Sequence, residues 1–307
     1  MRRYFPPMTQ SDDPDRAHEA GAAPALAAEE ESDEAAEKAA RRQPSTNLPR
    51  YPVRQDPLLT TDPNKIEDPS KRAWAETRLR RINRWRRPLT RKRDRARAWL
   101  NMLFVDHGFI RAVYPNIWQV TPLMWRSAQP LPHHIRRFAE AGGRTVVTLR
   151  GGQMFGSLPL EAEACARYGL DFQTIVLRSR DLPPAHEMLR IIDALREIET
   201  PVLFHCKSGA DRAGFMAALW LLEREGATLE EARGQLSLRY GHIRASKTGI
   251  LDFFFQRFAE ETAPGQPAEG MALRDWVAER YDRDALRESF RPPAFGTLIT
   301  DVLLRRE

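Results

Sequence analysis

Short apolar runs alternate with stretches of helical periodicity between residues 116 and 260. The runs predicted to form strands are rich in β-branched and aromatic residues, and they lie at 116–120, 123–125, 144–149, 171–177 and 201–204. Between and after them, apolar residues recur at helical spacing at 132–141, 160–168, 187–198, 215–225, 229–238 and 249–260. Strands that alternate with helices of this length are typical of βαβ units. The pattern therefore predicts an α/β fold with a central, mostly parallel sheet flanked by helices.

The two ends of the chain differ from this central part. Residues 11–37 contain ten acidic residues and one basic residue among many alanines, and 43–69 are rich in proline, aspartate and threonine. Such segments bury little apolar area, so we expect residues 1–69 to form a disordered, acidic and proline-rich extension. After a link rich in proline and glycine, the patterns ALRDWVAERY and FGTLITDVLL predict a C-terminal helical extension within 263–307.

Positive charge is concentrated between Lys71 and Arg97, where 13 lysines and arginines outnumber two acidic residues. Tryptophans and aliphatic residues recur among the arginines at roughly helical spacing, so residues 70–105 are predicted to form a basic helical segment, interrupted at Pro88. Three interpretations are open: a solvated helical face, a surface that docks on an anionic membrane and, least favoured, a nucleic-acid contact. The central domain then spans 106–262.

The composition limits the classes of binding partner and the cellular compartment that we expect. The chain of 307 residues carries a net charge of +6, which favours acidic or phosphorylated partners. Its two cysteines, Cys165 and Cys206, do not make a disulfide framework, so a reducing, cytoplasmic location is expected. If the basic segment 70–105 docks on an anionic membrane, the protein is expected to be located peripherally at that membrane. We expect neither a signal peptide nor a transmembrane helix.

The candidate chemistry lies in FHCKSGADRAGF, residues 204–215, between a predicted buried strand and a predicted buried helix. In an open α/β sheet, ligands bind at the carboxyl ends of strands. A short loop that enters a helix N-terminus there directs several backbone N–H groups at one point, and the helix dipole strengthens their attraction for an anion. The loop is therefore predicted to bind phosphate through Cys206, Lys207, Ser208, Gly209, Ala210, Asp211 and Arg212.

Three side chains of this loop have predicted chemical roles. Cys206 is the candidate nucleophile, because a helix N-terminus and nearby positive charge favour the thiolate form of cysteine. Arg212 follows it after five residues, and its planar guanidinium suits two oxygens of a tetrahedral anion. His205 is expected to support the loop and the thiolate.

The sequence HCKSGADRAG resembles the Cys-x5-Arg loop of the protein tyrosine and dual-specificity phosphatase superfamily. WRSAQP at 125–130, VVTLR at 146–150 and the downstream GHIRASKTGILDFFFQRF are similar to the bacterial dual-specificity branch, so the resemblance covers about residues 106–260. It implies a tyrosine-phosphatase-like fold, a phosphatase domain at 106–262 and chemistry that needs no metal or other cofactor.

The resemblance also implies a two-step hydrolysis of a phosphomonoester. Cys206 attacks phosphorus and forms a phosphocysteine, while Arg212 and the loop amides stabilise the equatorial oxygens. A general acid protonates the leaving oxygen and later acts as base toward water. Two aspartates are candidates for it. Asp181 in SRDLPP follows a predicted strand, as the acid does in most of the superfamily, whereas Asp211, slightly preferred, lies in the loop beside Arg212, as in some relatives.

One departure from the family pattern keeps a second function class open. Ala213 stands where the family usually has Ser or Thr, whose hydroxyl assists loss of the thiolate. The alternative to an enzyme is therefore a catalytically impaired phosphate-binding module of the same fold. For an enzyme, the substrate alternatives are phosphotyrosine or dual-specificity protein substrates, a lipid phosphate at a membrane surface, and a soluble phosphate. Lys207 resembles the lipid-directed members, whose loops often read His-Cys-Lys.

Overall fold

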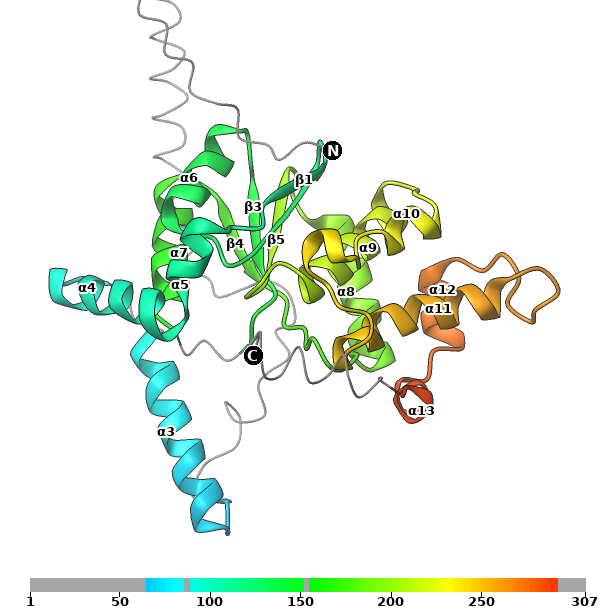
Figure 1. Ribbon diagram of the computed structural model, residues 1–307, viewed down its shortest axis with the longest axis horizontal. Helices are drawn as coiled ribbons and strands as arrows, with labels where there is room; N and C mark the ends of the chain where they lie inside the picture. Colours follow the sequence, from blue (N-terminus) through cyan, green and yellow to red (C-terminus); the bar gives the residue numbers. More distant parts are fainter. Residues whose placement is uncertain (1–64, 86–88, 152–154, 292–307) are drawn as a thin grey trace, which may run out of the picture.

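A five-stranded sheet lies at the centre of the protein in a computed structural model that describes residues 65–85, 89–151 and 155–291. The strands follow the spatial order β1-β2-β5-β3-β4. They are β1 (Trp118–Thr121), β2 (Met124–Ser127), β3 (Thr145–Thr148), β4 (Asp171–Thr174) and β5 (Val202–His205). In this sheet β2, β5, β3 and β4 run parallel, and β1 pairs antiparallel with β2. The predicted α/β class with a mostly parallel sheet is confirmed (Figure 1).

The parallel strands are apolar on both faces, and neighbouring residues belong to different hydrophobic clusters. Val202 and Phe204 of β5 pack in the larger cluster, whereas Leu203 between them packs in a smaller one. Val147 and Val146 of β3 divide in the same way. Because successive side chains of a strand point to opposite faces, the two clusters cover the two faces of the sheet.

Helices cover both faces (Figure 1). The larger cluster lies under α8 (Ala185–Glu197) and α9 (Asp211–Arg224), and the smaller one under α6 (Pro132–Glu140) and α7 (Ser157–Arg167). Residues 215–220 of α9 are all 0% exposed, as its apolar pattern predicted. The short α10 (Leu229–Arg233), the 3-10 turns η3 (Leu238–Tyr240) and η4 (Lys247–Gly249), and α11 (Ile250–Thr262) follow. Phe254 of α11 packs on Phe215 of α9, with ring centroids 5.4 Å apart.

The predicted elements agree with the structure except at some ends. The strand predicted at 171–177 leaves the ladder after Thr174, although the next residues still donate to the backbone of 148–149. The helix predicted at 229–238 ends at Arg233, and turns follow that place Gln235 against Arg126. The disorder predicted for the N-terminal extension and the helix predicted at FGTLITDVLL fall on residues outside the described ranges, apart from 65–69.

In the described part of the chain, four helical segments precede the sheet. They are α3 (Pro69–Trp85), α4 (Lys92–Leu100), the π-helical turn η2 (Asn101–Val105) and α5 (Gly108–Val113). Trp85, Ala98 and Met102 pack with Leu131 and Leu160 in a third hydrophobic cluster, which fastens these segments to α6 and α7. Beyond this contact α3 extends away from the sheet (Figure 1). None of the helices in the described ranges combines the length and hydropathy of a membrane-spanning segment.

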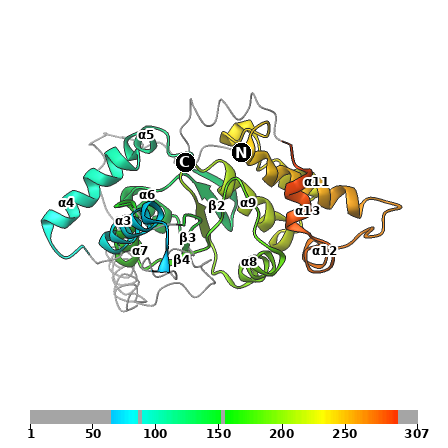
Figure 2. The same cartoon turned by 90° about the horizontal axis from the view of Figure 1, so that it is seen from below.

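Two further helices, α12 (Leu273–Glu279) and α13 (Arg283–Ser289), pack beside α11 (Figure 2). Trp276 and Tyr281 belong to the larger hydrophobic cluster, so residues 263–291 share the core of the central domain. The Tyr281 hydroxyl donates to Pro183 O at 2.8 Å, and Arg274 pairs with Asp193 of α8 at 2.8 Å.

The substitution Gly156→Ala is expected to loosen α4 from α7. A Cβ at this position would lie 2.4 Å from Ala98 O and 2.7 Å from Ala98 Cα, so α4 must shift. Overpacking of this kind costs about 1–3 kcal/mol. We expect a lower Tm and faster tryptic cleavage within α4, measured by thermal denaturation and limited proteolysis.

The matched control is Ala166→Gly on the exposed side of α7. It costs about 1 kcal/mol of helix stability without touching α4, so it should lower Tm without exposing the α4 cleavage sites. Unchanged cleavage in Gly156→Ala would contradict the packing described above.

Candidate active site

The loop 205–212 lies where three parallel strands end at the same level. Ser127 at the end of β2 and Thr148 at the end of β3 both stand in register with His205 at the end of β5. Cys206 follows immediately, and α9 begins at Asp211. The structure thus places the predicted loop at the carboxyl edge of the sheet and at the N-terminus of a buried helix, where anions are stabilised.

The carbonyl oxygens of four consecutive loop residues, 207–210, are all held by donors outside the loop. Gln129 N donates to the first oxygen at 3.3 Å, and Asn116 Nδ2 to the second at 2.9 Å. Arg126 Nη2 donates to the third and fourth at 2.8 and 3.0 Å. Because the N–H of a trans peptide points opposite to its C=O, these bonds turn the following amides toward the inner side of the loop.

The sulfur of Cys206 lies on this inner side. Gly209 N donates to Cys206 Sγ at 3.2 Å, and the residue is 1% exposed. Gly209 has φ +74°, a left-handed conformation that brings its backbone within reach of the sulfur and that favours glycine. The predicted nucleophile and the predicted anion-binding amides are therefore brought together.

Arg126 of β2 is the buried cation that fixes the loop from below. Its Nη1 donates to Gln235 O and Oε1 at 2.7 and 3.0 Å, and its guanidinium lies 4.0 Å from the centre of the Tyr240 ring. Burial lowers the pKa of Arg126 to about 10, so the side chain remains protonated at neutral pH. A buried charge of this kind is tolerated because both terminal nitrogens donate to oxygens and one face of the guanidinium lies on the Tyr240 ring.

His205 begins a chain of buried polar contacts that leads away from the loop. Its Nε2 lies 2.6 Å from Glu161 Oε1, and Glu161 Oε2 accepts a hydrogen bond from Gln129 Nε2 at 2.7 Å. Gln129 Oε1 in turn accepts from Arg150 Nη1 at 2.7 Å. Arg150 also forms a bidentate pair with Asp106, at 2.7 and 2.8 Å. His205 thus contacts α7 through Glu161, and the contacts continue through the β2–α6 connection to Arg150 and Asp106.

Asp106 fastens the N-terminal helices to this network. It is 0% exposed and pairs with both Arg150 and Arg111. Burial alone would raise the pKa of Asp106, but the hydrogen bond and charge of Arg150 outweigh it and hold that pKa below its usual range.

Asp211 is buried at the first position of α9 and bound to a histidine that the sequence did not single out. His242 Nδ1 lies 2.6 Å from Asp211 Oδ1, and His242 Nε2 lies 2.5 Å from Asp252 Oδ2. Arg212, the next residue, is half-buried in the first turn of α9, as are Lys207 and Ser208 in the loop. Ala210 and Ala213 are buried.

Asp181 lies in a different environment from Asp211. It is mostly buried, its Oδ1 lies 3.3 Å from Arg287 Nε of α13, and its Oδ2 lies 3.7 Å from Arg178 Nη1. Its hydrogen bonds and ion pairs in the described residues thus join it to α13 and to its own loop, and not to 205–212. The geometry places Asp211, rather than Asp181, among the loop residues.

The second cysteine packs on the opposite side of the sheet. Cys165 is 0% exposed in the smaller hydrophobic cluster, and burial raises the pKa of its thiol well above the usual range. It is a core residue of α7. The described ranges hold no cluster of three or more His, Cys, Asp or Glu side chains suited to a metal ion.

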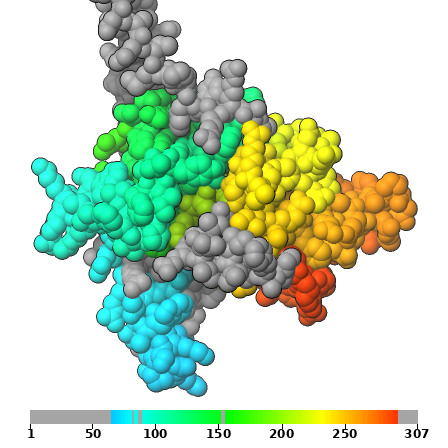
Figure 3. Space-filling model, viewed as in Figure 1, coloured from blue at the N-terminus to red at the C-terminus, as the bar shows by residue number. Residues whose placement is uncertain are grey.

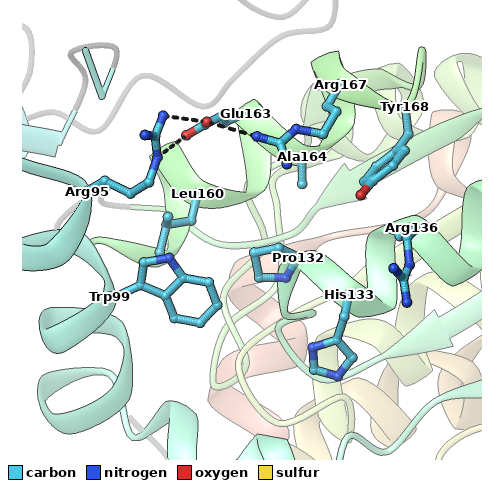
Figure 4. A pocket seen from close by; sticks show the side chains of 10 residues that line it. All are labelled: Arg95, Trp99, Pro132, His133, Arg136, Leu160, Glu163, Ala164, Arg167 and Tyr168. Carbon is cyan, nitrogen blue, oxygen red and sulfur yellow. Dashed lines mark hydrogen bonds and ion pairs between the residues drawn. The ribbon is translucent and has the colours of Figure 1, made fainter. Parts of the chain in front are cut away.

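A surface cavity of about 220 Å³ lies away from the loop, between α4, α6 and α7 (Figure 4). Trp99, Leu160 and Pro132 form its apolar side. Glu163 projects at its rim, where Arg95 donates to it at 2.6 Å and Arg167 pairs with it at 3.5 Å. Glu163 thus pairs with two of the three arginines that line the cavity, and none of the lining residues belongs to the loop.

The sequence predicted no role for several residues that build the site, although four of them lie in the motifs that carry the family resemblance. They are Asn116, Arg126, Gln129, Glu161, His242 and Asp252. Arg126 had a detectable signal, because an arginine within a fully buried strand requires a buried partner. The others come from loops and helices whose contact with 205–212 follows from the tertiary structure alone.

Comparison with protein families gives one match. Residues 116–242, which include the loop, Arg126 and His242, match the family model described as "PTP-SAK: Swiss Army Knife protein, DSP-PTPase phosphatase domain". No curated protein matches the chain.

Solved structures with a similar fold include TpbA from P. aeruginosa, which is 18% identical with a TM-score of 0.35 over 57% of this chain and 90% of that chain. Tk-PTP in its active form is 20% identical with a TM-score of 0.36, over 47% of this chain and 98% of its own. The catalytic core of the PP-IP phosphatase SIW14 from S. cerevisiae is 16% identical with a TM-score of 0.37, over 48% and 92%. The family match covers residues 116–242, which is less than half of the chain.

The substitution Gly209→Ala is expected to abolish oxyanion binding by the loop. A Cβ there would lie 2.5 Å from Ala128 N and 2.7 Å from Ser127 C, both backbone atoms, and the residue has φ +74°. The loop would therefore have to move away from the groups that donate hydrogen bonds to its carbonyl oxygens. We expect the affinity for vanadate or phosphate, measured by calorimetry, to fall at least 100-fold.

Gly142→Ala is the matched control, because Gly142 has φ +84° with nothing within 4 Å of the added Cβ. Alanine at this position costs about 1 kcal/mol because of its left-handed backbone conformation, without any steric clash. This variant should therefore bind the anions normally. Equal affinity in both variants would contradict the loop geometry.

Proposed function

Because residues 116–242 match a family model of a DSP-PTPase phosphatase domain, we propose that this protein hydrolyses phosphomonoesters through a covalent phosphocysteine on Cys206. The observation that carries the proposal is the orientation of the loop. Donors from Asn116, Arg126 and Gln129 hold its carbonyls outward, and Cys206 Sγ lies with the amides on the inner side. A phosphate there meets N–H donors around the nucleophile, as phosphoryl transfer requires.

The reaction proceeds in two steps. The Cys206 thiolate attacks phosphorus, an S–P bond forms, and the P–O ester bond breaks with its electron pair on the leaving oxygen. The loop amides and Arg212 stabilise the equatorial oxygens, and Asp211 protonates the leaving oxygen. Water then attacks phosphorus, gives its proton to Asp211, and releases phosphate and the thiolate.

In the second step, residue 213 offers no side-chain hydroxyl to the departing sulfur. Ala213 is 0% exposed at the position where the family usually has Ser or Thr, so no side-chain hydroxyl at this position assists departure of the thiolate. Hydrolysis of the phosphocysteine is therefore expected to be slow relative to its formation. A phosphate-binding module that never turns over is the limiting case of this effect.

We further propose that the substrate is a lipid phosphate presented on an anionic membrane. Support comes from an exposed apolar surface on residues 100–114, here named the 100–114 surface. Its large apolar side chains are 47 to 88% exposed, and they are Leu100, Phe104, Val105, Phe109, Ile110, Val113 and Tyr114. The other exposed large apolar side chains in the described residues, Trp74, Leu123 and Leu238, lie apart from it in the sequence. A concentration of this kind is typical of an interaction site.

Charge next to the 100–114 surface favours an anionic bilayer over an apolar protein partner. The segment that includes α4 lies at the surface of the molecule (Figure 3). On or just before α4, four basic residues are exposed: Arg91, Lys92, Arg93 and Arg97. Basic residues that flank exposed aromatic and aliphatic side chains match the headgroup and acyl layers of an anionic membrane.

The 100–114 surface is also joined to the loop by short connections. Tyr114 is followed two residues later by Asn116, which holds Ser208 O, and Asp106 is bound to Arg150 of the buried network. A bilayer that contacts this surface therefore lies close to the phosphate site. Together with the absence of a disulfide framework, these features support a cytoplasmic enzyme that associates peripherally with membranes.

Cys206→Ser is expected to abolish turnover of an aryl phosphate, because serine at this position is not ionised and does not attack phosphorus at a measurable rate. The wild type should be inhibited by vanadate and should release a burst of aryl alcohol equal to the enzyme concentration. Mass spectrometry of the quenched protein should find phosphate on Cys206. Cys165→Ser, which changes a buried thiol on the other face of the sheet, is the matched control and should retain activity. Activity that survives Cys206→Ser would refute the mechanism.

Phe104→Ser and Val113→Ser are expected to weaken binding to phosphatidylserine-rich vesicles tenfold or more each, because full transfer of such a side chain from water contributes about 1.5–3 kcal/mol. Vesicle sedimentation measures binding, and release of phosphate from a phosphoinositide in the same vesicles measures turnover. Leu123→Ser, at an exposed apolar position on the β1–β2 turn, is the control. Equal turnover of soluble phosphotyrosine peptide by all variants shows intact folding. Absence of vesicle binding by the wild type would favour the protein substrates instead.

A further inference from the structure

His242 is buried between two carboxylates that come from different helices. Its side chain is 0% exposed, with Nδ1 at 2.6 Å from Asp211 Oδ1 in α9 and Nε2 at 2.5 Å from Asp252 Oδ2 in α11. A neutral histidine in a hydrophobic core needs a hydrogen-bond acceptor for its one N–H group. Here both ring nitrogens are aligned with carboxylate oxygens at short hydrogen-bond distance, and one of those carboxylates belongs to the phosphate loop.

The two contacts require two protons for the three groups. A neutral imidazole donates from one nitrogen alone, so a second short contact to an ionised carboxylate would set two lone pairs against each other. Two arrangements satisfy the geometry with the same number of protons. Either an imidazolium lies between two carboxylates, or a neutral imidazole accepts a hydrogen bond from one protonated carboxyl.

The surroundings decide which carboxyl takes the mobile proton. Asp252 Oδ1 also accepts a hydrogen bond from Arg244 Nε at 2.9 Å, so Asp252 faces a second, permanently charged donor that favours its role as an acceptor. It keeps the proton on His242 Nε2. The proton that can move is therefore the one between His242 Nδ1 and Asp211, on the side of the phosphate loop.

We propose that His242 is a positioning residue that supplies, through its Nδ1, the proton which Asp211 delivers to the leaving oxygen, and that Asp252 orients the imidazole for this transfer. This inference rests on the proposed phosphatase function and deepens it.

The proton transfers balance over the two steps. Asp211 gives its proton to the ester oxygen as the P–O bond breaks, and the alcohol leaves with the electron pair of that bond. His242 is then neutral, with its one remaining proton on Nε2 toward Asp252, and Asp211 is a carboxylate. When water attacks the phosphocysteine, its proton returns to this pair, and the thiolate leaves with the electrons of the S–P bond. No oxidant, metal or external base enters the cycle.

Electrostatics in the folded protein support the transfer. Burial would lower the pKa of His242, but the hydrogen bonds and charges of Asp211 and Asp252 outweigh it and raise that pKa above 6.5. The charged groups that face the unit are Arg244 on Asp252 and Arg126, whose charge acts on Asp211. The shared proton is therefore retained to a higher pH than on an isolated imidazole.

Leaving-group dependence tests the role of His242. General acid catalysis contributes about 10²–10⁴ in rate for a poor leaving group and little for a good one. We expect His242→Gln to lower kcat for phenyl phosphate at least 100-fold with KM nearly unchanged. For 2,4-dinitrophenyl phosphate, whose leaving group needs no proton, kcat should fall less than about fivefold. Asp252→Asn, which preserves the shape of the site, should show the same pattern more weakly.

The pH profile supplies an independent readout. In the wild type, kcat/KM for phenyl phosphate should decline only above pH 6.5, where the shared proton is lost. In His242→Gln the acid is a carboxyl alone, so this decline should move down by more than one pH unit. His134→Gln, a change at another buried histidine in α6, is the matched control for loss of stability and should leave the profile in place.

The outcomes separate the inference from the function on which it rests. Equal losses on both esters with an unmoved pH profile would overturn the proton transfer and leave the phosphatase standing. No turnover of either ester by the wild type would overturn the phosphatase, and the proton transfer with it. If His242→Gln does not fold by circular dichroism, the same comparison with Asp252→Asn decides.

Discussion

The whole site depends on one buried guanidinium, that of Arg126. Four consecutive peptide groups with their amides directed at one point repel one another unless their carbonyls find donors on the far side. Arg126 Nη2 donates to two of those carbonyls from β2, and Nη1 is fixed by Gln235. The loop is therefore shaped before any ligand arrives, so that an incoming phosphate meets preorganised dipoles rather than a chain that must first become ordered.

The same principle of shared buried polar groups joins the loop to the outer parts of the molecule. His205, Glu161 and Gln129 lead to Arg150, and Arg150 leads to Asp106 at the end of η2. From Glu161 to Asp106 each member is hydrogen-bonded to the next, so removal of one would leave a charge or amide unsatisfied at its neighbour. The N-terminal helices, which carry the exposed apolar side chains, are for this reason part of the domain that holds the catalytic sulfur.

Sequence patterns predicted what depends on local order along the chain. The strands, their alternation with helices, and the loop after β5 follow from runs of adjacent residues, and the structure confirms them. The residues that shape the loop were not found, because Asn116 and Arg126 are 92 and 83 residues away from the carbonyls they hold. His242 was invisible for a related reason. Its neighbours in the sequence do not indicate a role for it. The carboxylates that it contacts come from α9 and α11, which meet around it only in the folded protein.

The placement of the two cysteines on opposite faces of the sheet has a consequence for oxidative stress. Cys206 lies with the larger cluster and Cys165 with the smaller, so a layer of backbone separates the two sulfurs. A sulfenic acid formed on Cys206 by peroxide thus has no resolving thiol within its own fold, and the chain has no third cysteine. Recovery from such damage falls to small thiols of the cell, such as glutathione, and would follow their supply.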